Sequence, residues 1–436
     1  MVFRPEEAEY HFALHVMHHL RFPKLRAVDV RPQRQNGYLY YLLADPLELS
    51  DDSLLVPQAF GPLLALCDGS QSDAAAICRT LAQRYQLALD PTTIRQLLDA
   101  LDEACLLENQ RSAAALAQKV ADYRALPARP AAHAGLAYPD EPRTLTRLLD
   151  GYLNAPIGPR GVDDRARRNG SALRQEVTGV FSPHIDYGRG GPVYARTWQA
   201  AAQAAQAAEL VILIGTDHQG DDLFTLTRQS YATPFGLLPT ATDVVDDLAQ
   251  AVGEKAAFAG ELRHLREHSL ELVAIWLQHA RRGRPVEMLP VLVGGLYRFF
   301  ADARGPAGDD RIQRFVETVR GHAAGRRTLV VASGDLSHVG PAFGGQPLNR
   351  SARASLAASD DGLVERLTAG DGEGFYRSIC GVQDKNNVCG LTPTYLTLKI
   401  LGKGVRGERL AYDSCPADEA STSAVTIGGV VFGGGD

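Results

Sequence analysis

Residues 210–218 of this chain are Leu-Val-Ile-Leu-Ile-Gly-Thr-Asp-His, an unbroken apolar run that leads through a short polar turn to a histidine. An apolar run without alternation is typical of a strand that helices cover on both faces of a parallel sheet. The same texture recurs at residues 177–181, 288–293 and 328–332. Helical patterns lie between these runs, at residues 195–208, 266–282 and 310–323. Alternating strands and helices predict an α/β domain with a layered, mostly parallel sheet flanked by helices.

The bulk composition is that of an ordinary globular protein, with 436 residues, 45% hydrophobic and 22% charged. This length is sufficient for two or three domains. A net charge of −6 gives no electrostatic footprint for nucleic acid or an anionic membrane, so we expect neither as a partner. No apolar run approaches the roughly 20 residues that span a bilayer. The first dozen residues are too polar for a signal peptide, and six scattered cysteines do not form a disulfide framework, so we expect a cytoplasmic protein.

We expect four segments along the chain. Residues 1–24 form a helical segment, 25–110 a small domain, 111–131 a helical tail and linker, and 132–436 the α/β domain. The first segment places four histidines on one helical face: His11, His15, His18 and His19. Two interpretations remain open for this face, a metal-chelating pair and an ordinary amphipathic terminal helix.

The small domain is predicted to be α+β and winged-helix-like. Asn36-Gly37 separates the strand-like runs 27–30 and 38–43, which is a signal for a type I′ hairpin. Ser72 is expected to cap a following helix, and Asp90-Pro91 to open another one, because proline at the first helical position loses no hydrogen bond.

This order of a hairpin, the segment Leu-Leu-Ala-Leu-Cys-Asp-Gly at 63–69 and two helices resembles the PqqD-like fold. That family is known for binding leader peptides. The resemblance implies that an extended peptide adds to an edge strand of the hairpin, with the helix at 91–107 as the other wall. The alternative is a domain that only packs on its neighbour or mediates dimerisation.

Histidines follow three of the four predicted buried strands. His184 lies in the segment 182–188, His218 in 215–219, and His338 ends Ser-Gly-Asp-Leu-Ser-His at 333–338, which also contains Asp335. Ligands of open α/β sheets bind beyond the carboxyl ends of the strands. One such histidine is often only a structural hydrogen-bonding group, but three at equivalent strand ends favour a shared site.

Two further candidates lie at predicted helix starts. His268, flanked by Glu267 and Glu271, suits either proton transfer or a capping role at the surface. Cys389 precedes a predicted helix, whose N-terminus favours the thiolate and therefore a ligand or a nucleophile. Cys380, which is also followed by glycine, is a rival for that role. The two cysteines have no partner pair at zinc-finger spacing.

Taken in order, these motifs resemble the Memo-like family, also called AmmeMemoRadiSam system protein B. The likeness extends from about residue 132 to residue 436. It rests on the segments Ala132-His133-Ala134-Gly135 with Tyr138, Pro183-His184, Gly215-x-x-His218, Tyr231-x-Thr233-Pro234-Phe235-Gly236, Glu267-His268-Ser269-Leu270-Glu271, Pro290-x-x-x-Gly294, Ser333-x-Asp335-x-x-His338, Cys389-Gly390 and 423–432.

The resemblance implies a fold like that of class III extradiol dioxygenases, which hold Fe(II) with two histidines and a carboxylate. It implies His184, His218 and Cys389 as metal ligands. Asp335 and His338 match the polar pair beside them, and His268 fits an acid–base or supporting group. The implied metal is non-haem Fe(II), with copper as the alternative, because a thiolate and two imidazoles suit these ions better than magnesium or calcium. The family name implies a radical SAM protein and an AMMECR-type protein as partners.

The chain departs from the family pattern at a few positions. Asp186 and Asp217 are extra acids beside the candidate ligands, and Leu136-Ala137 stands where the family has tryptophan. Two functions from different classes therefore remain open. One is a dioxygenase-like metal-dependent oxidoreductase that acts on a small or peptidyl substrate. The other is a non-catalytic peptide- or partner-binding module on the same scaffold, because fold likeness alone does not define activity.

Overall fold

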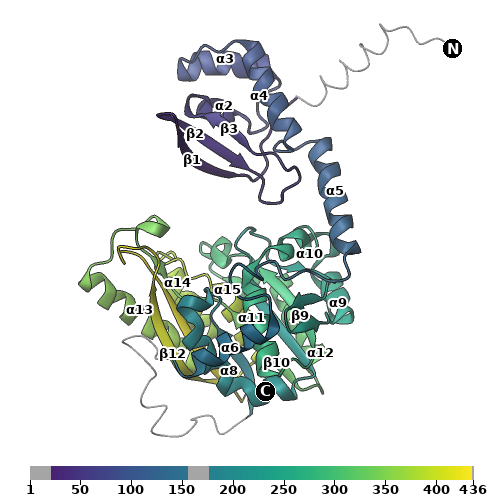
Figure 1. Cartoon of the computed structure of the whole chain (residues 1–436), viewed down its shortest axis with the longest axis vertical. Coiled ribbons are helices and arrows are strands. Elements are labelled where there is room, and N and C mark those ends of the chain that lie inside the picture. Colours follow the sequence, from purple (N-terminus) through teal and green to yellow (C-terminus); the bar gives the residue numbers. More distant parts are fainter. Residues whose placement is uncertain (1–20, 156–175, 435–436) are drawn as a thin grey trace, which may run out of the picture. The chain divides into compact units, whose positions relative to one another are not determined.

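The computed structural model describes residues 21–155 and 176–434 (Figure 1). It divides the chain into two compact units, Met1–Ala125 and Leu126–Asp436, which are described one at a time below. The histidine face expected in the first segment, at His11, His15, His18 and His19, lies outside the described residues.

The first unit contains a three-stranded antiparallel sheet with the order β1-β2-β3. Its strands are β1 (Asp29–Gln35), β2 (Tyr38–Ala44) and β3 (Leu54–Pro57). Asn36 and Gly37 join β1 to β2 with φ angles of 51° and 83°. A type I′ turn requires positive φ at both central residues, so the predicted hairpin is confirmed.

Helices follow the sheet of the first unit: η1 (Gln58–Phe60), α2 (Gly61–Leu66), α3 (Ala74–Tyr85), α4 (Pro91–Glu103) and α5 (Gln110–Ala125). Helix α4 begins at Pro91, as predicted. The predicted cap of α3 is wrong by one residue. The carboxylate of Asp73, not the hydroxyl of Ser72, accepts a hydrogen bond from the Ala76 N–H at 2.8 Å. Aspartate and serine are comparable caps, so the local pattern alone did not separate these neighbours.

The second unit is built on an eight-stranded sheet with the path β11-β13-β4-β10-β5-β9-β6, and β12 pairs with β13. The central strands β4 (Val177–Ser182), β10 (Thr328–Ser333), β5 (Leu210–Thr216) and β9 (Glu287–Val293) run parallel to one another. They contain the four apolar runs of the sequence, so the predicted mostly parallel sheet is confirmed. The remaining strands pair antiparallel: β6 (Thr225–Leu226), β11 (His338–Val339), β12 (Arg406–Pro416) and β13 (Ala424–Gly433). A separate hairpin joins β7 (Tyr231–Thr233) and β8 (Gly236–Leu238).

Helices cover both faces of this sheet (Figure 1). The first face carries α6 (Pro142–Leu153), α8 (Tyr187–Ala207) and α11 (His268–Ala280). The second face carries α9 (Thr242–Val252), α12 (Asp310–Ala323), α13 (Arg350–Thr368), α14 (Gly372–Cys380) and α15 (Leu391–Leu401). Strand β5 shows why its sequence does not alternate: Val211 and Leu213 pack in the first core, whereas Ile212 and Ile214 pack in the second. Because the central strands are parallel, the loops after β4, β5 and β10 emerge at one edge of the sheet.

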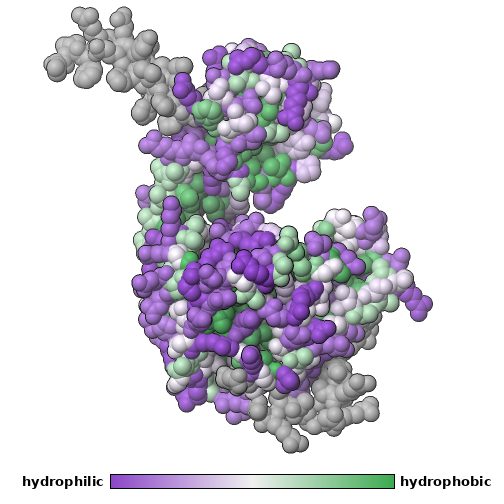
Figure 2. Space-filling view, turned by 180° about the vertical axis from the view of Figure 1, so that it is seen from behind, coloured by the Kyte–Doolittle hydropathy of each residue, from purple (hydrophilic) through white to green (hydrophobic). Residues whose placement is uncertain are grey.

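Short helical segments complete the second unit: α10 (Glu254–Ala257), η2 (Glu261–Leu265), η3 (Leu296–Phe299), η4 (Pro306–Gly308) and η5 (Pro341–Phe343). Hydrophilic residues dominate the face of the molecule in Figure 2, with hydrophobic residues in scattered patches. None of the helices within residues 21–155 and 176–434 combines the length and apolar character that a membrane span needs.

A buried arginine fastens the first residues of the second unit. Arg129 is completely buried, and its guanidinium donates hydrogen bonds to the Glu271 carboxylate, to the His264 carbonyl at 2.8 Å and to the Glu267 carbonyl at 3.1 Å. The Glu271 carboxylate also accepts from the Tyr138 hydroxyl and from backbone N–H groups at residues 132 and 133. This arginine lies in the segment 111–131 that the sequence analysis treats as tail and linker, yet it is a core residue of the second unit.

We therefore predict that a fragment of residues 126–436 folds by itself, whereas a fragment of residues 132–436 is much less stable. The shorter fragment leaves the Glu271 carboxylate buried without Arg129, and the loss of one partner from a buried ion pair costs about 3–5 kcal/mol. Differential scanning calorimetry should show a melting temperature lower by several degrees for the shorter fragment.

The matched control is Arg228→Ala in the longer fragment. Arg228 forms an exposed ion pair with Asp246, which contributes less than about 1 kcal/mol in typical cases. Equal melting temperatures for the fragments that begin at residues 126 and 132 would contradict the anchoring role of Arg129.

Candidate metal centre

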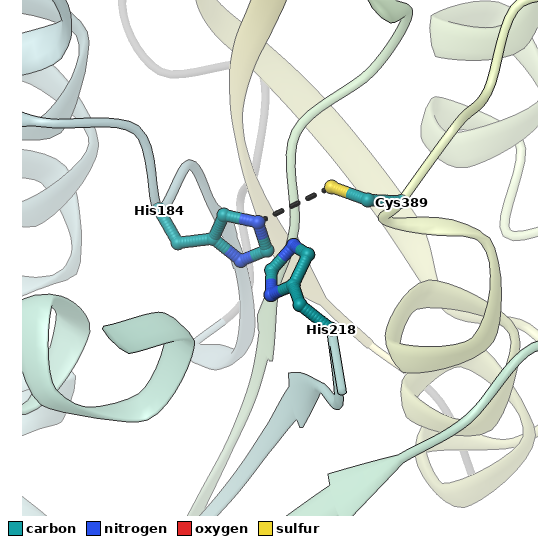
Figure 3. A group of neighbouring side chains, drawn as sticks. All are labelled: His184, His218 and Cys389. Carbon is teal, nitrogen blue, oxygen red and sulfur yellow. Dashed lines mark hydrogen bonds between the residues drawn. The ribbon is translucent and has the colours of Figure 1, made fainter. Parts of the chain in front are cut away.

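Three candidate ligands converge at the carboxyl edge of the parallel strands (Figure 3). His184 follows β4, His218 follows β5, and Cys389 immediately precedes the cap of α15. The Cys389 sulfur lies 3.2 Å from Nε2 of His184, and the two imidazole centroids are 5.0 Å apart. One donor atom from each side chain lies within 4.8 Å of the others, so a single ion can contact all three.

The other predicted site residues lie against this triad. Asp335 and His338 form a second metal-capable group with Cys389, again with donor atoms within 4.8 Å of one another. The His268 ring centroid is 4.8 Å from that of His218 and 5.4 Å from that of His184. The structure therefore brings all six residues singled out from the sequence into one pocket.

Glycines make the approach of Cys389 to Asp335 sterically feasible. A Cβ atom on Gly334 would lie 2.4 Å from Cα of Gly390, and one on Gly390 would lie 2.7 Å from the Asp335 carbonyl oxygen. Real Cβ atoms do not make contacts this short, so the loops that carry the two site residues can meet only through glycines. The motif Cys389-Gly390 thus has a packing reason, and the Asp335 N–H donates to the Cys389 sulfur at 3.3 Å.

The imidazoles are held by their Nδ1 atoms. Nδ1 of His218 lies 3.0 Å from the Glu267 carboxylate, and Nδ1 of His338 lies 3.0 Å from the Asn387 carbonyl. These oxygens only accept, so we assign the ring proton to Nδ1 in both histidines.

His184 is also held at its Nδ1 by an acceptor, which is the hydroxyl of Ser333. Its Nδ1 lies 3.2 Å from the Ser333 hydroxyl, which itself donates to the Ser269 carbonyl at 2.5 Å and is therefore the acceptor for His184. All three rings thus keep their Nε2 lone pair unprotonated when neutral. Metal-binding histidines in proteins are usually oriented in this way by a partner on the other nitrogen.

Glu267 is a functional residue that the sequence analysis missed, since it considered this residue only as a neighbour of His268. Its buried carboxylate caps α11 through the Ser269 N–H at 2.9 Å and contacts both the backbone N–H and Nδ1 of His218 at 3.0 Å. The same carboxylate lies 3.1 Å from Nδ1 of His268. One helix cap therefore orients two imidazoles of the pocket.

Burial and neighbouring charges set the protonation of these groups. Burial, reinforced by the positive charge of other histidines, lowers the pKa of His184 well below its ordinary value. Burial acts in the same direction on His218, but the hydrogen bond and charge of Glu267 outweigh it and raise the pKa of His218. Burial would raise the pKa of Glu267, yet hydrogen bonds from His218 and His268 hold it well below its usual range.

The expectation of a readily ionised thiol at Cys389 is wrong for the metal-free protein. Burial and the nearby Asp335 carboxylate raise the pKa of Cys389 well above its ordinary value. The helix that follows is capped at Gly390, and its N-terminus does not offset these effects. The thiol is therefore protonated at neutral pH, and a metal ion must displace that proton to bind.

The remaining candidates contact partners outside the proposed ligand set. Cys380 ends α14 with its sulfur 3.7 Å from the Phe300 carbonyl, and it belongs to none of the metal-capable groups within the described part of the chain. Asp186 caps α8 and pairs with Arg189 at 2.6 Å. Asp217 is buried and pairs with Arg263 at 2.6 Å. The two extra acids are therefore engaged by arginines.

Comparison with known proteins gives a family match over the second unit. The family model described as Memo-like protein matches residues 129–431. A MEMO1 family protein from Methanopyrus kandleri is 27% identical over 65% of this chain and 91% of its own length, and one from Thermus thermophilus is 27% identical over 67% and 79%. A MEMO1 family protein from Aquifex aeolicus is 24% identical over 94% of this chain and 99% of its own length. The Aquifex alignment is too long to fit within the second unit, so it includes residues of the first unit.

We predict that Glu267→Gln lowers the pKa of His218 in the metal-free protein, because the variant removes the negative charge that raises it. The measurement is a pH titration of ¹⁵N-labelled imidazoles by NMR. The ion pair of Glu267 with His218 stabilises the fold at pH values above the ordinary pKa of glutamate and below that of histidine. The stability lost in the variant should therefore be largest between about pH 4.5 and pH 6.5, at about 1–3 kcal/mol.

The control variant is Asp247→Asn, which changes a carboxylate that pairs with a different histidine, His322, at 2.8 Å. This control should leave the pKa of His218 unchanged. An unchanged or higher pKa of His218 in Glu267→Gln would refute the assigned role of Glu267.

Proposed function

We propose that this chain, which belongs to the Memo-like protein family, uses the pocket of its second unit as a non-haem metal centre for redox chemistry on a small or peptidyl substrate. The resemblance to the Memo-like family that the sequence motifs indicated is confirmed over residues 129–431. The proposed ligands are His184, His218 and Cys389, and the proposed metal is Fe(II), with copper as the second choice. The proposed activity resembles that of extradiol dioxygenases.

The observation that carries this proposal is the convergence of two Nδ1-anchored imidazoles and one thiol on a single point. This donor set contains one soft and two intermediate ligands, which suit iron or copper and do not suit magnesium or calcium. Anchored Nδ1 atoms also fix the direction of the Nε2 lone pairs before an ion arrives, so little orientational freedom is lost on binding.

The side chains around the triad suit the handling of protons. When bound, iron or copper would supply the electron transfer that these side chains do not provide. His268 is partly exposed and, with Nδ1 at the Glu267 carboxylate, has Nε2 available for a substrate proton. The buried Asp335 carboxyl has a raised pKa because of its burial, and one of its oxygens lies 3.9 Å from Nε2 of His184. His338 shares the Cys389 side of the pocket.

The alternative is a non-catalytic module that binds a peptide or a partner on the same scaffold. Two observations favour it. The third member of the proposed ligand set is a thiol and not the carboxylate that extradiol dioxygenases use. The buried Asp335 carboxylate is already engaged, because one of its oxygens accepts the backbone N–H of His184 at 2.9 Å. Metal analysis of anaerobically purified protein, followed by oxygen-uptake assays with catechols and peptides, separates the two functions. Bound iron or copper without oxygen uptake on any substrate favours the alternative.

We predict that His218→Ala loses bound metal, whereas His268→Gln keeps it and slows any turnover by about 100-fold or more. The first variant removes a ligand, and the second removes a proton-transfer group. Metal content by plasma mass spectrometry and single-turnover rates are the measurements.

The control for both variants is His322→Ala, which removes a histidine that pairs with Asp247 away from the pocket. Its metal content should equal that of the wild type. Loss of metal in His268→Gln would mean that His268 is a ligand. A metal content of His218→Ala equal to that of the wild type would contradict the proposed ligand set.

For the first unit, we propose a PqqD-like role in which an extended peptide of a partner adds to an edge of the three-stranded sheet. The sequence predicts this edge in the hairpin β1–β2, but we favour the other edge, strand β3. The proline of β3, Pro57, is its last residue, whereas Pro32 removes a hydrogen-bond donor from the middle of β1. The proposed partners are a radical SAM protein and an AMMECR-type protein, which rests on the family resemblance alone.

We predict that the intact chain, but not a fragment of residues 126–436, is retained by these partners when they are expressed together. Leu55→Pro in the intact chain should weaken retention, since it removes a backbone donor from β3. Co-purification at matched expression levels is the measurement, with metal content as a check on folding of the second unit. Equal retention of the fragment and the intact chain would assign the partner surface to the second unit.

A further inference from the structure

The second unit has an open hollow of about 530 Å³. Its lining residues are Tyr297, Phe300, Ala301, Gln383, Asp384 and Asn387. Asn387 links the hollow to the pocket, because its carbonyl accepts from Nδ1 of His338 at 3.0 Å and its side-chain amide donates to the His338 carbonyl at 3.1 Å. One wall of the hollow thus also supports a residue of the metal centre.

That wall has an unusual backbone. Gln383, Asp384 and Asn387 all adopt left-handed conformations, with φ angles of 52°, 45° and 50°. Such conformations are uncommon for residues other than glycine, and they concentrate at functional sites when surrounding contacts maintain them. Here the contact is the Asp384 carboxylate, which accepts from the Val388 N–H at 2.9 Å and so fixes the residue before Cys389.

The wall supplies hydrogen-bond acceptors. One side-chain N–H of Gln383 donates to the Cys380 carbonyl at 3.2 Å, and one of Asn387 donates to the His338 carbonyl at 3.1 Å. The side-chain carbonyl oxygens of both residues can only accept. Asp384 adds a carboxylate, and none of the described residues that line the hollow carries a positive charge.

Two aromatic side chains, Tyr297 and Phe300, also line the hollow. The Tyr297 hydroxyl donates to the Asp221 carboxylate. Burial and this carboxylate raise the pKa of Tyr297 to about 12, while the positive charge of Arg298 acts in the opposite direction. The tyrosine is therefore neutral at physiological pH, and Arg298 is a cation near the hollow without belonging to its lining.

We propose that this hollow binds the ammonium group of an organic amine, and that the substrate of the metal centre is an amine. Aromatic faces attract a cation, and the carboxylate with two amide oxygens matches the three N–H donors of a primary ammonium. The inference rests on the proposed function in one respect: it treats the hollow as the recognition part of the same site. The ammonium belongs to either a small amine or a lysine side chain.

The test measures binding to the full-length, metal-free protein by isothermal titration calorimetry. The probes are 2-phenylethylamine and an acetylated Gly-Lys-Gly amide, compared with 2-phenylethanol and 3-phenylpropionate. At least one of the two ammonium probes should bind about tenfold more tightly than the alcohol, and the carboxylate should bind most weakly. Tighter binding of the lysyl peptide assigns the ammonium to a peptide substrate, and tighter binding of phenylethylamine assigns it to a small amine.

Two variants change the charge of the site in opposite directions. Asp384→Asn should weaken amine binding about tenfold, and its side-chain oxygen can still accept from the Val388 N–H, so the loop is retained. Arg298→Ala should tighten amine binding, because it removes the nearby positive charge. Asp243→Asn, in the first turn of α9, is the matched control and should change nothing.

Measurement of the metal content distinguishes a failure of the amine proposal from a failure of the proposed metal centre. The Asp384 and Arg298 variants should bind as much iron as the wild type, while their amine affinity changes. Absence of metal in the wild type would refute the proposed metal centre and leave the amine titration valid. Equal affinity for amine and alcohol, or unchanged affinity in both charge variants, would overturn the amine proposal.

Discussion

The Glu267 carboxylate is the group on which the geometry of the metal centre most depends. It caps α11 and fixes both the backbone and the ring of His218, and it also lies against Nδ1 of His268. A buried carboxylate is stable only when it is paired and hydrogen-bonded. Here the backbone N–H groups of His218 and Ser269 donate hydrogen bonds, and the two imidazoles add further contacts. Part of the cost of its burial is therefore offset only while the rings remain in these positions. The contacts of Glu267 with these imidazoles therefore contribute both to the stability of the fold and to the geometry of the site.

Burial gives the pocket a low charge before any metal binds. It keeps His184 neutral and the Cys389 thiol protonated, and it raises the pKa of Asp335. A divalent ion that enters such a site must displace the thiol proton, and it then neutralises the new thiolate. Protons and metal therefore compete for the same atoms, which makes metal affinity increase with pH. At His218, the negative charge of Glu267 favours protonation.

The fold was predictable where the information is local. Four apolar runs defined the parallel strands, and histidines at their ends indicated the site, because parallel strands share one carboxyl edge. Cys389 needed the family resemblance, since a cysteine before a helix has many structural roles. Glu267, Arg129 and Asn387 were not predicted, because their partners are far away in sequence: Glu267 contacts His218, Arg129 contacts Glu271, and Asn387 contacts His338. The predicted helix cap at Ser72 was wrong for a local reason, since Asp73 beside it is an equally good cap.

The contacts that build the metal centre all lie within the second unit, from Arg129 onward. Arg129 holds the carbonyls of His264 and Glu267, so the start of this unit supports the carboxylate that orients His218 and His268. The relative from Methanopyrus kandleri aligns over 91% of its own length with only 65% of this chain, as expected if such a unit can exist alone. The Aquifex relative, in contrast, extends over residues of both units.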